Sequence, residues 1–240
     1  MNQNNTGFMG AIPVVTRNLL IVNALFFVAQ MLLGASVPIN KYLALQFYES
    51  DYFYPHQVIT YMFLHGGITH IFFNMFALFM FGRTLEMVWG PKKFLIYYIV
   101  TGIGAALAQE VVYTIQFSEI IFNPEIMNIN TGEQIFTRQE FFNLLPPTLG
   151  ASGAIFGILA AFGMLFPNSE LFIIPFPFPI KAKWLVIGYG ILELGLGISN
   201  NAADNVAHFA HLGGLLTGLI ILLYWKKKGK LTTRDGNFQR

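Results

Sequence analysis

The chain has 240 residues, of which 55% are hydrophobic and only 11% are charged. A soluble domain carries about 25% charged residues, so most of this chain is expected to face something other than water. Cysteine is absent, which excludes a disulfide framework and thiol chemistry. The composition, together with several long apolar runs, therefore predicts an all-α membrane protein, and the absence of cysteine leaves its redox compartment open.

Six apolar windows are candidates for membrane-crossing helices. The hydrocarbon core of a bilayer is about 30 Å thick and needs about 20 residues of helix. The fourth window is shorter, ends before Pro167, and is expected to span only if other helices surround it. In chain order, the windows are 18–33, 59–81, 94–117, 152–166, 184–199 and 205–225.

The first window is expected to be a retained helix. The first 16 residues contain no basic residue, and the apolar run from Leu19 is longer than the hydrophobic region of a secretory signal. The predicted organisation is a short cytoplasmic N-terminal segment (1–16), one six-helix domain (17–225) and a basic cytoplasmic tail (226–240).

The basic residues set the expected orientation. If the N-terminus is cytoplasmic, only Lys41 and Arg138 of the 14 Lys and Arg residues lie outside, which agrees with the positive-inside rule. Both termini are then cytoplasmic, and the two large loops, 34–58 and 118–149, lie outside. The first loop is rich in aromatic residues, which suits the membrane interface. The second is acidic and polar, and its length suggests a solvated loop.

Three spans are expected to deliver polar groups to one depth. Spans two, four and six all run from outside to inside, so residues near their N-terminal ends share a level. His70 and Asn74 come from span two, Ser152 opens span four, and His211 lies near the start of span six. Polar groups at membrane depth are costly, and they mark functional sites or helix contacts.

Ser152 is the candidate nucleophile. It lies in Gly150-Ala151-Ser152-Gly153, where glycines permit a tight turn and close backbone approach. A helix N-terminus also supplies free N–H groups and the positive end of the helix dipole. Taken alone, this tetrapeptide fits an ordinary helix-capping serine with packing glycines better than it fits a nucleophile.

Small residues are expected to bring spans four and six together. Gly153 and Gly157 share one face of span four, and Gly214 and Gly218 repeat this spacing in span six. Such faces let helix backbones approach closely in lipid. If they pack together, Ser152 and His211 meet at the top of the contact. Phe156, one turn after Ser152, is then placed to stack on the imidazole.

Two histidines compete for the role of general base. His211 directly precedes the glycine face and is the preferred base, whereas His208 is expected nearer water, capping or solvating the entrance. His70 and Asn74 are four residues apart and project side by side as donors for a developing oxyanion. Hydrogen bonding between helices explains this pair equally well.

No carboxylate is expected beside the base. Glu193 falls inside span five, and no Asp or Glu is obviously ready to orient an imidazole, so the sequence predicts a Ser-His dyad. A metal site is not predicted either. The histidines form no His-Glu-x-x-His motif, and no carboxylate accompanies them at ligand spacing.

These motifs together resemble the rhomboid family of intramembrane serine proteases. The similarity covers about residues 17–224, and the joint occurrence of three motifs in order is highly specific. The segments that carry it are His65-Gly66-Gly67-Ile68-Thr69-His70-Ile71-Phe72-Phe73-Asn74, Gly150-Ala151-Ser152-Gly153, and Ala210-His211-Leu212-Gly213-Gly214 followed by Gly218.

The resemblance implies a six-helix bundle with a short central fourth helix below a cavity open to the outer face. Ser152 is then the nucleophile and His211 the base, while His70, Asn74 and the Ser152 backbone N–H form the oxyanion hole. Gly150, Gly153, Phe156, Gly214 and Gly218 support this site. Substrates are expected to enter from lipid near Phe73 and residues 194–198.

The resemblance also sets the expected partners and location. The partners are transmembrane protein substrates and the lipid bilayer, with no nucleic acid and no cofactor. We expect an integral protein of a bacterial inner (plasma) membrane. Two rivals stay open: an inactive rhomboid-like protein that binds membrane segments, and a small transporter that uses Glu110, Glu193 and the histidines as a proton relay.

Overall fold

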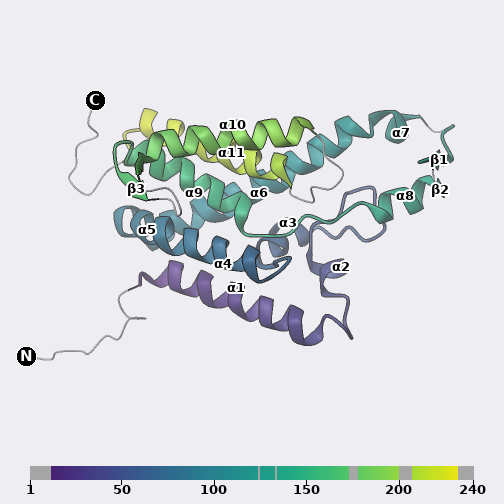
Figure 1. Ribbon diagram of the computed structural model, residues 1–240, viewed down its shortest axis with the longest axis horizontal. Coiled ribbons are helices and arrows are strands. Elements are labelled where there is room, and N and C mark those ends of the chain that lie inside the picture. Colours follow the sequence, from purple (N-terminus) through teal and green to yellow (C-terminus); the bar gives the residue numbers. More distant parts are fainter. Residues whose placement is uncertain (1–11, 124, 133, 173–177, 200–206, 232–240) are drawn as a thin grey trace, which may run out of the picture.

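The computed structural model describes residues 12–123, 125–132, 134–172, 178–199 and 207–231. Most of the predicted segment 1–16, the start of the sixth window and the tail beyond residue 231 lie outside this part. Helices dominate and run along the long axis of the molecule (Figure 1). Within the described residues, five are long and apolar enough to cross a membrane: α1 (Val14–Leu33), the continuous helix Ile68–Trp89, α6 (Pro91–Gln116), α10 (Ala182–Ser199) and α11 (His208–Lys227).

The second apolar helix begins and ends later than predicted. Its first part, α4 (Ile68–Ala77), starts after Gly66-Gly67, and the segment before these glycines forms two separate short helices. The window 59–81 therefore starts too early, because its first residues belong to this separate segment. The short helices are α3 (Gln57–Thr60) and η2 (Tyr61–Phe63).

The far end of this helix is set by a glycine and a proline. α4 passes through a π-helical turn, η3 (Leu78–Gly82), into α5 (Arg83–Trp89). Gly90 then adopts φ 79°, and Pro91 occupies the first turn of α6. Glycine adopts the left-handed conformation that ends a helix, and proline suits the first helical position. Together they stop one helix and start the next.

α9 (Ser152–Leu165) is a shorter apolar helix of 14 residues. All of its residues except Ser152 and Met164 are buried, and it packs against α6, α10 and α11 as well as α4 and α5. A helix that is apolar on every side is stable only when other elements surround it. The fold therefore encloses α9 and leaves only Ser152, at its N-terminal end, and Met164, near its C-terminal end, partly accessible.

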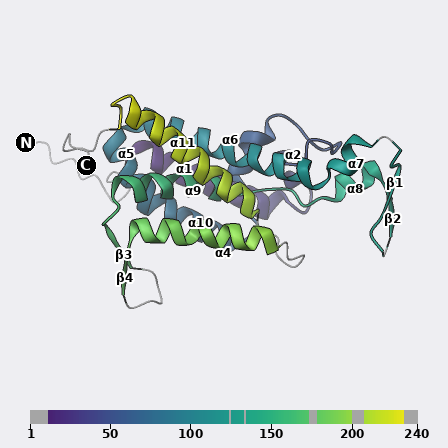
Figure 2. The same ribbon diagram turned by 90° about the horizontal axis from the view of Figure 1, so that it is seen from above.

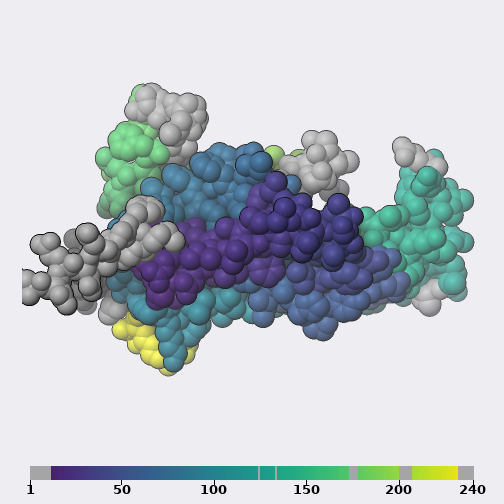
Figure 3. Space-filling model, turned by 90° about the horizontal axis from the view of Figure 1, so that it is seen from below, coloured from purple at the N-terminus to yellow at the C-terminus, as the bar shows by residue number. Residues whose placement is uncertain are grey.

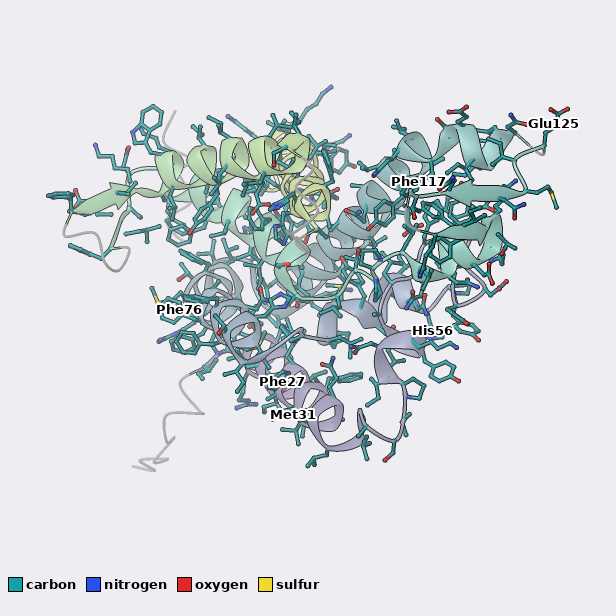
Figure 4. All side chains as sticks on the ribbon, turned by 45° about the vertical axis from the view of Figure 1, so that its right-hand side comes forward. Phe27, Met31, His56, Phe76, Phe117 and Glu125 are labelled. Atoms are coloured by element: carbon teal, nitrogen blue, oxygen red, sulfur yellow. The ribbon has the colours of Figure 1, made fainter. Side chains whose placement is uncertain are left out.

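The loop that was predicted to be merely solvated is a folded extension. It carries α7 (Ser118–Phe122), the antiparallel hairpin β1 (Asn128–Asn130) and β2 (Ile135–Thr137), and α8 (Arg138–Leu144). These elements project from the end of the molecule opposite to the start of α1 and the end of α11 (Figures 1 and 2). Glu125 lies at the far end of the projection (Figure 4).

The first large loop packs against this extension. It contains α2 (Ile39–Leu43), and Leu45 pairs with Thr148 through two backbone hydrogen bonds of 2.8 and 2.9 Å. Phe47 is 3% exposed and lies against the rings of Phe117 and Phe142. The location of this loop at the membrane interface stays a prediction, whereas Phe47 itself is buried between the two loops and helps to hold them together.

A second hairpin joins α9 to α10. β3 (Glu170–Phe172) pairs antiparallel with β4 (Pro179–Lys181), with Leu171 opposite Ile180. Figure 3 shows this hairpin standing out from the body of the molecule, while α1 lies across the face in view. The two short sheets are small additions to a helical fold and lie in the connections between helices.

The outer sides of the long helices are apolar and accessible. Leu25 on α1 is 62% exposed, Phe72 on α4 60% and Ile191 on α10 67%. Met31 and Phe76 likewise point away from the packed interior (Figure 4). Soluble monomers rarely expose apolar surface on this scale. These helix faces therefore suit contact with lipid.

Glu86 of α5 connects this helix to the start of α1 through hydrogen bonds. Its carboxylate accepts hydrogen bonds from the backbone N–H groups of Val15 and Thr16 and from the Thr16 hydroxyl, at 2.7–2.9 Å. The two backbone N–H groups are donors that the first turn of a helix leaves without an intrahelical acceptor. Both Glu86 and Thr16 are buried, so water does not replace the carboxylate as their partner.

We expect Glu86→Ala to lower the free energy of unfolding by about 2 kcal/mol or more, because buried donors lose their acceptor. Equilibrium unfolding in mixed detergent measures this loss. Thr84→Ala is the matched control, since the Thr84 hydroxyl makes an exposed bond to the Met80 carbonyl one turn away. Equal stability of the two variants would contradict the proposed role of Glu86.

Candidate active site

Ser152 is the first residue of α9, where the chain turns sharply into the helix. The N-cap position belongs to Ala151, so Ser152 is not the capping serine that its motif suggested in isolation. Gly150, two residues earlier, has φ 131°, a backbone conformation that residues other than glycine rarely adopt. A Cβ at Gly150 would lie 2.8 Å from the His70 ring and 3.5 Å from Ser152 Oγ. The turn therefore requires glycine and brings His70 close to Ser152.

Glycines bring α9 and α11 into backbone contact. A Cβ added at Gly214 would lie 1.9 Å from the Gly153 carbonyl oxygen, and one at Gly218 would lie 3.1 Å from Gly157 Cα. The two small-residue faces thus meet, as their spacing predicts. Tyr97 on α6 reinforces the contact by donating a 2.7 Å hydrogen bond to the Gly157 carbonyl.

This packing joins Ser152 to His211. Ser152 Oγ lies 2.7 Å from His211 Nε2, within hydrogen-bond distance. The Phe156 ring stacks on the imidazole at 4.5 Å between centroids and 8° between planes. The hydroxyl can donate to Nε2, which leaves the ring hydrogen of a neutral imidazole on Nδ1. This is the geometry of a serine with an adjacent general base.

A carboxylate lies on the other side of the base, contrary to expectation. Glu193 Oε2 from α10 is 3.0 Å from His211 Nδ1 and 2.6 Å from His208 Nδ1. Only the contact with His208 has hydrogen-bond geometry; the Nδ1–H of His211 is not aligned with the carboxylate oxygen. His208 is only 7% exposed, so the prediction that it solvates the entrance is wrong.

These three residues bear on metal binding as well. Glu193, His208 and His211 offer ligand atoms that all lie within 4.8 Å of one another. The expectation that no carboxylate lies at ligand spacing from the histidines is therefore wrong, because α10 supplies one from a distant part of the chain. The predicted lack of a metal stays a prediction.

His70 has one ring nitrogen fixed and the other near the serine. Its Nδ1 accepts a 3.2 Å hydrogen bond from the Gly66 backbone N–H. A neutral ring that accepts at Nδ1 carries its hydrogen on Nε2, the side of the ring that adjoins Gly150. The Gly66-Gly67 break before α4 thus orients His70 as a donor near Ser152.

Asn74 is a buried donor one turn after His70. It is 6% exposed, and its Nδ2 finds no hydrogen-bond partner among the described residues. An unpaired buried amide is costly and calls for an explanation, such as a ligand that is bound only during function. Asn74 does not line the cavity described next, whereas His70 does.

The site opens into a cavity of about 1020 Å³. Ser152, His70, His208 and His211 line its wall, together with Gln109 of α6 and residues 145–150 of the connection before α9. A volume of this order accommodates a peptide segment and water. The cavity lies at the end of the bundle that carries the folded loops, because its lining includes the C-terminal part of α6 and the N-terminal part of α11.

Comparison with known proteins assigns the family. The Rhomboid domain matches residues 52–228, which is most of the chain and includes every residue of this site. The chain belongs to the rhomboid family. It is accordingly an integral membrane protein, in agreement with the five long apolar helices found among the described residues.

Curated rhomboids from distant organisms resemble the chain. Rhomboid protease AarA of Providencia stuartii is 32% identical over 163 residues, which is 67% of this chain and 52% of that protein. Rhomboid protein 1, mitochondrial, of Saccharomyces cerevisiae is 28% identical over 192 residues, 79% of this chain and 46% of that protein. Rhomboid protease GluP of Bacillus subtilis is 29% identical over 163 residues, 68% of this chain and 24% of that protein. The chain thus matches about half of these relatives' lengths or less.

Sequence reasoning missed one residue of this rhomboid site. Glu193 had a visible signal, because a carboxylate in the middle of an apolar helix needs a polar partner. The sequence did not show which partner, since that depends on how α10 is rotated against α11. In the structure, the Glu193 carboxylate contacts both His208 and His211.

Proposed function

We propose that this rhomboid is an intramembrane serine endopeptidase that hydrolyses peptide bonds in or near transmembrane segments of membrane proteins. The observation that carries the proposal is the 2.7 Å contact between Ser152 Oγ and His211 Nε2 at the wall of a large cavity. Two of the relatives, from Providencia stuartii and Bacillus subtilis, are named as rhomboid proteases.

The reaction is acyl transfer in two steps. Ser152 Oγ attacks the substrate carbonyl carbon while its proton passes to His211 Nε2, and the carbonyl oxygen becomes an oxyanion. His211 then gives this proton to the leaving amine as the C–N bond breaks. A water deprotonated by His211 hydrolyses the acyl-enzyme, releases the new carboxyl terminus and restores Ser152.

The oxyanion is stabilised by donors from α4 and from the start of α9. His70 Nε2 adjoins Gly150, and the first backbone N–H groups of α9 have no intrahelical acceptor. Asn74 contributes an amide that has no partner among the described residues in the resting structure. Such donors act most strongly where charge develops in a site that excludes bulk water.

The membrane arrangement follows the same proposal. α9 is a sixth, short and central span that packs against four of the five longer ones, and both termini are cytoplasmic. The start of α1 and the end of α11 lie at the same end of the molecule, which supports this orientation (Figure 1). Water reaches Ser152 through the cavity from the outer side. Substrates approach from lipid past Phe73 and residues 194–198, where Phe73 and Ile198 are exposed.

Covalent labelling tests the nucleophile directly. The purified protein in detergent, treated with a fluorophosphonate, is expected to gain one adduct on the peptide that contains Ser152. Reconstituted in vesicles, it is expected to cleave a single-span membrane protein in or beside its span. An unlabelled Ser152 together with uncut substrates would overturn the proposal and favour an inactive membrane-segment binder.

We expect Asn74→Ala to lower kcat by about 10²-fold with little change in KM, because an oxyanion donor acts mainly in the transition state. Cleavage of a reconstituted substrate at several concentrations separates the two parameters. Asn23→Ala, which removes a buried amide of α1 bonded within its own helix, is the control for loss of a polar core group. An Asn74 variant as active as the control would remove Asn74 from the oxyanion hole.

A further inference from the structure

The carboxylate of Glu193 occupies the position that an orienting acid has beside a catalytic histidine. Its Oε2 lies 3.0 Å from His211 Nδ1, on the opposite edge of the ring from Ser152. In serine hydrolases, an acid at this edge fixes the tautomer and stabilises the imidazolium. The Glu193 side chain comes from α10, and the dyad predicted from the sequence assigns it no role.

His208 holds the carboxylate in place. A carboxylate only accepts hydrogen bonds, so the 2.6 Å contact is donated by His208 Nδ1–H. Glu193 and His208 are 8% and 7% exposed, so this bond is largely shielded from water. The two imidazole rings are nearly perpendicular, at 88°, and approach the same oxygen from different directions. The anchoring bond therefore leaves Oε2 beside His211.

The alignment of His211 suggests when the carboxylate acts. In the resting structure its Nδ1–H has no hydrogen-bond partner among the described residues, although Oε2 is 3.0 Å away. When Nε2 takes the serine proton, the ring becomes a cation next to an oxygen of opposite charge. The attraction at this distance grows in a site that water does not screen. The contact therefore strengthens as the transition state forms.

We propose that Glu193 is a positioning residue of the catalytic pair, held by His208, which stabilises the imidazolium formed on His211 when Ser152 loses its proton. The inference rests on the proposed protease function and deepens it, because it adds an orienting carboxylate, Glu193, to the pair of Ser152 and His211. A third histidine near His211, His70 of α4, is cationic or neutral and offers no countercharge.

Glu193→Gln tests the charge while keeping the shape. We expect kcat to fall about tenfold to a hundredfold, with KM and thermal stability unchanged. This loss is smaller than the fall in kcat of about 10⁴-fold that follows the same change in triads whose acid is aligned with the histidine. The rate of fluorophosphonate labelling at Ser152 is expected to fall in parallel. Glu193→Asp, which restores the charge on a shorter side chain, is expected to recover part of the loss.

The matched control is Glu110→Gln on α6, which makes the same change at a carboxylate bonded to the Tyr48 backbone N–H. Its kcat is expected to equal that of the unaltered protein. Unchanged kcat in Glu193→Gln would overturn the inference. So would a loss that tracks thermal stability and is not recovered by Glu193→Asp, because that pattern marks a purely structural carboxylate.

A metal held by Glu193 and the two histidines is the competing use of this cluster. Protein stripped with a chelator is expected to cleave and label at the original rate, and loss of activity that added Zn²⁺ restores would overturn the positioning role. All arms use protein that already cleaves and labels at Ser152. Failure of the inference is thus distinct from failure of the proposed function, in which the unaltered protein itself is inert.

Discussion

Ser152→Ala is expected to lower kcat by about 10⁴-fold or more, and His211→Ala is expected to lower it about as much. Ser152 Oγ and His211 Nε2 are 2.7 Å apart and act as one unit, so either loss removes the attack on the carbonyl. The double variant is then no slower than either single one. Residual cleavage comes from the oxyanion donors and substrate binding alone.

The measurement is cleavage of a single-span protein in proteoliposomes, scored by mass spectrometry of the new termini. Ser118→Ala, at an exposed serine that opens α7, is the control and is expected to cleave normally. Circular dichroism and thermal unfolding establish that each variant is folded. Strictly additive losses in the double variant would mean that the two residues act independently, which contradicts the pair.

The helices that hold this pair follow largely from the sequence. Long apolar runs need a membrane or a core, and Gly153, Gly157, Gly214 and Gly218 repeat at the spacing that lets two helices touch. The polar residues at one depth then identified Ser152 and His211 as a candidate pair. Contacts of this kind are set by periodicity along a helix, which a single sequence displays.

Other features depend on interactions that the sequence does not display. The second span was misplaced because hydropathy continues through Gly66-Gly67, although the helix starts only after them. The loop 118–149 reads as polar, yet Phe142 packs inward against Phe47 from the other loop. Glu193 contacts His211 because of the angle at which α10 is oriented about its own axis. A helix that is apolar on all sides has no separate apolar face from which this angle can be predicted.

Gly214→Val is expected to destabilise the protein and to inactivate it by separating α9 from α11. The added Cβ would lie 1.9 Å from the Gly153 carbonyl oxygen, and a backbone atom in an enclosed helix has no flexible end that can move aside. We expect a loss of about 3 kcal/mol or more in the free energy of unfolding, at or above the upper range for overpacked cores. Because Ser152 opens α9 and His211 lies one turn before Gly214, the same displacement lengthens the 2.7 Å catalytic contact.

Gly188→Val on α10 is the matched control, since a Cβ there meets no atom within 4 Å. Both variants exchange a helical glycine for the same side chain, so they share the change in helix propensity and differ in the clash. Thermal unfolding in detergent and the rate of Ser152 labelling are measured on both. Gly214→Ala gives the graded case, because it adds the clashing Cβ alone. Normal stability and labelling in the Gly214 variants would show that α9 and α11 have room to separate without breaking the pair.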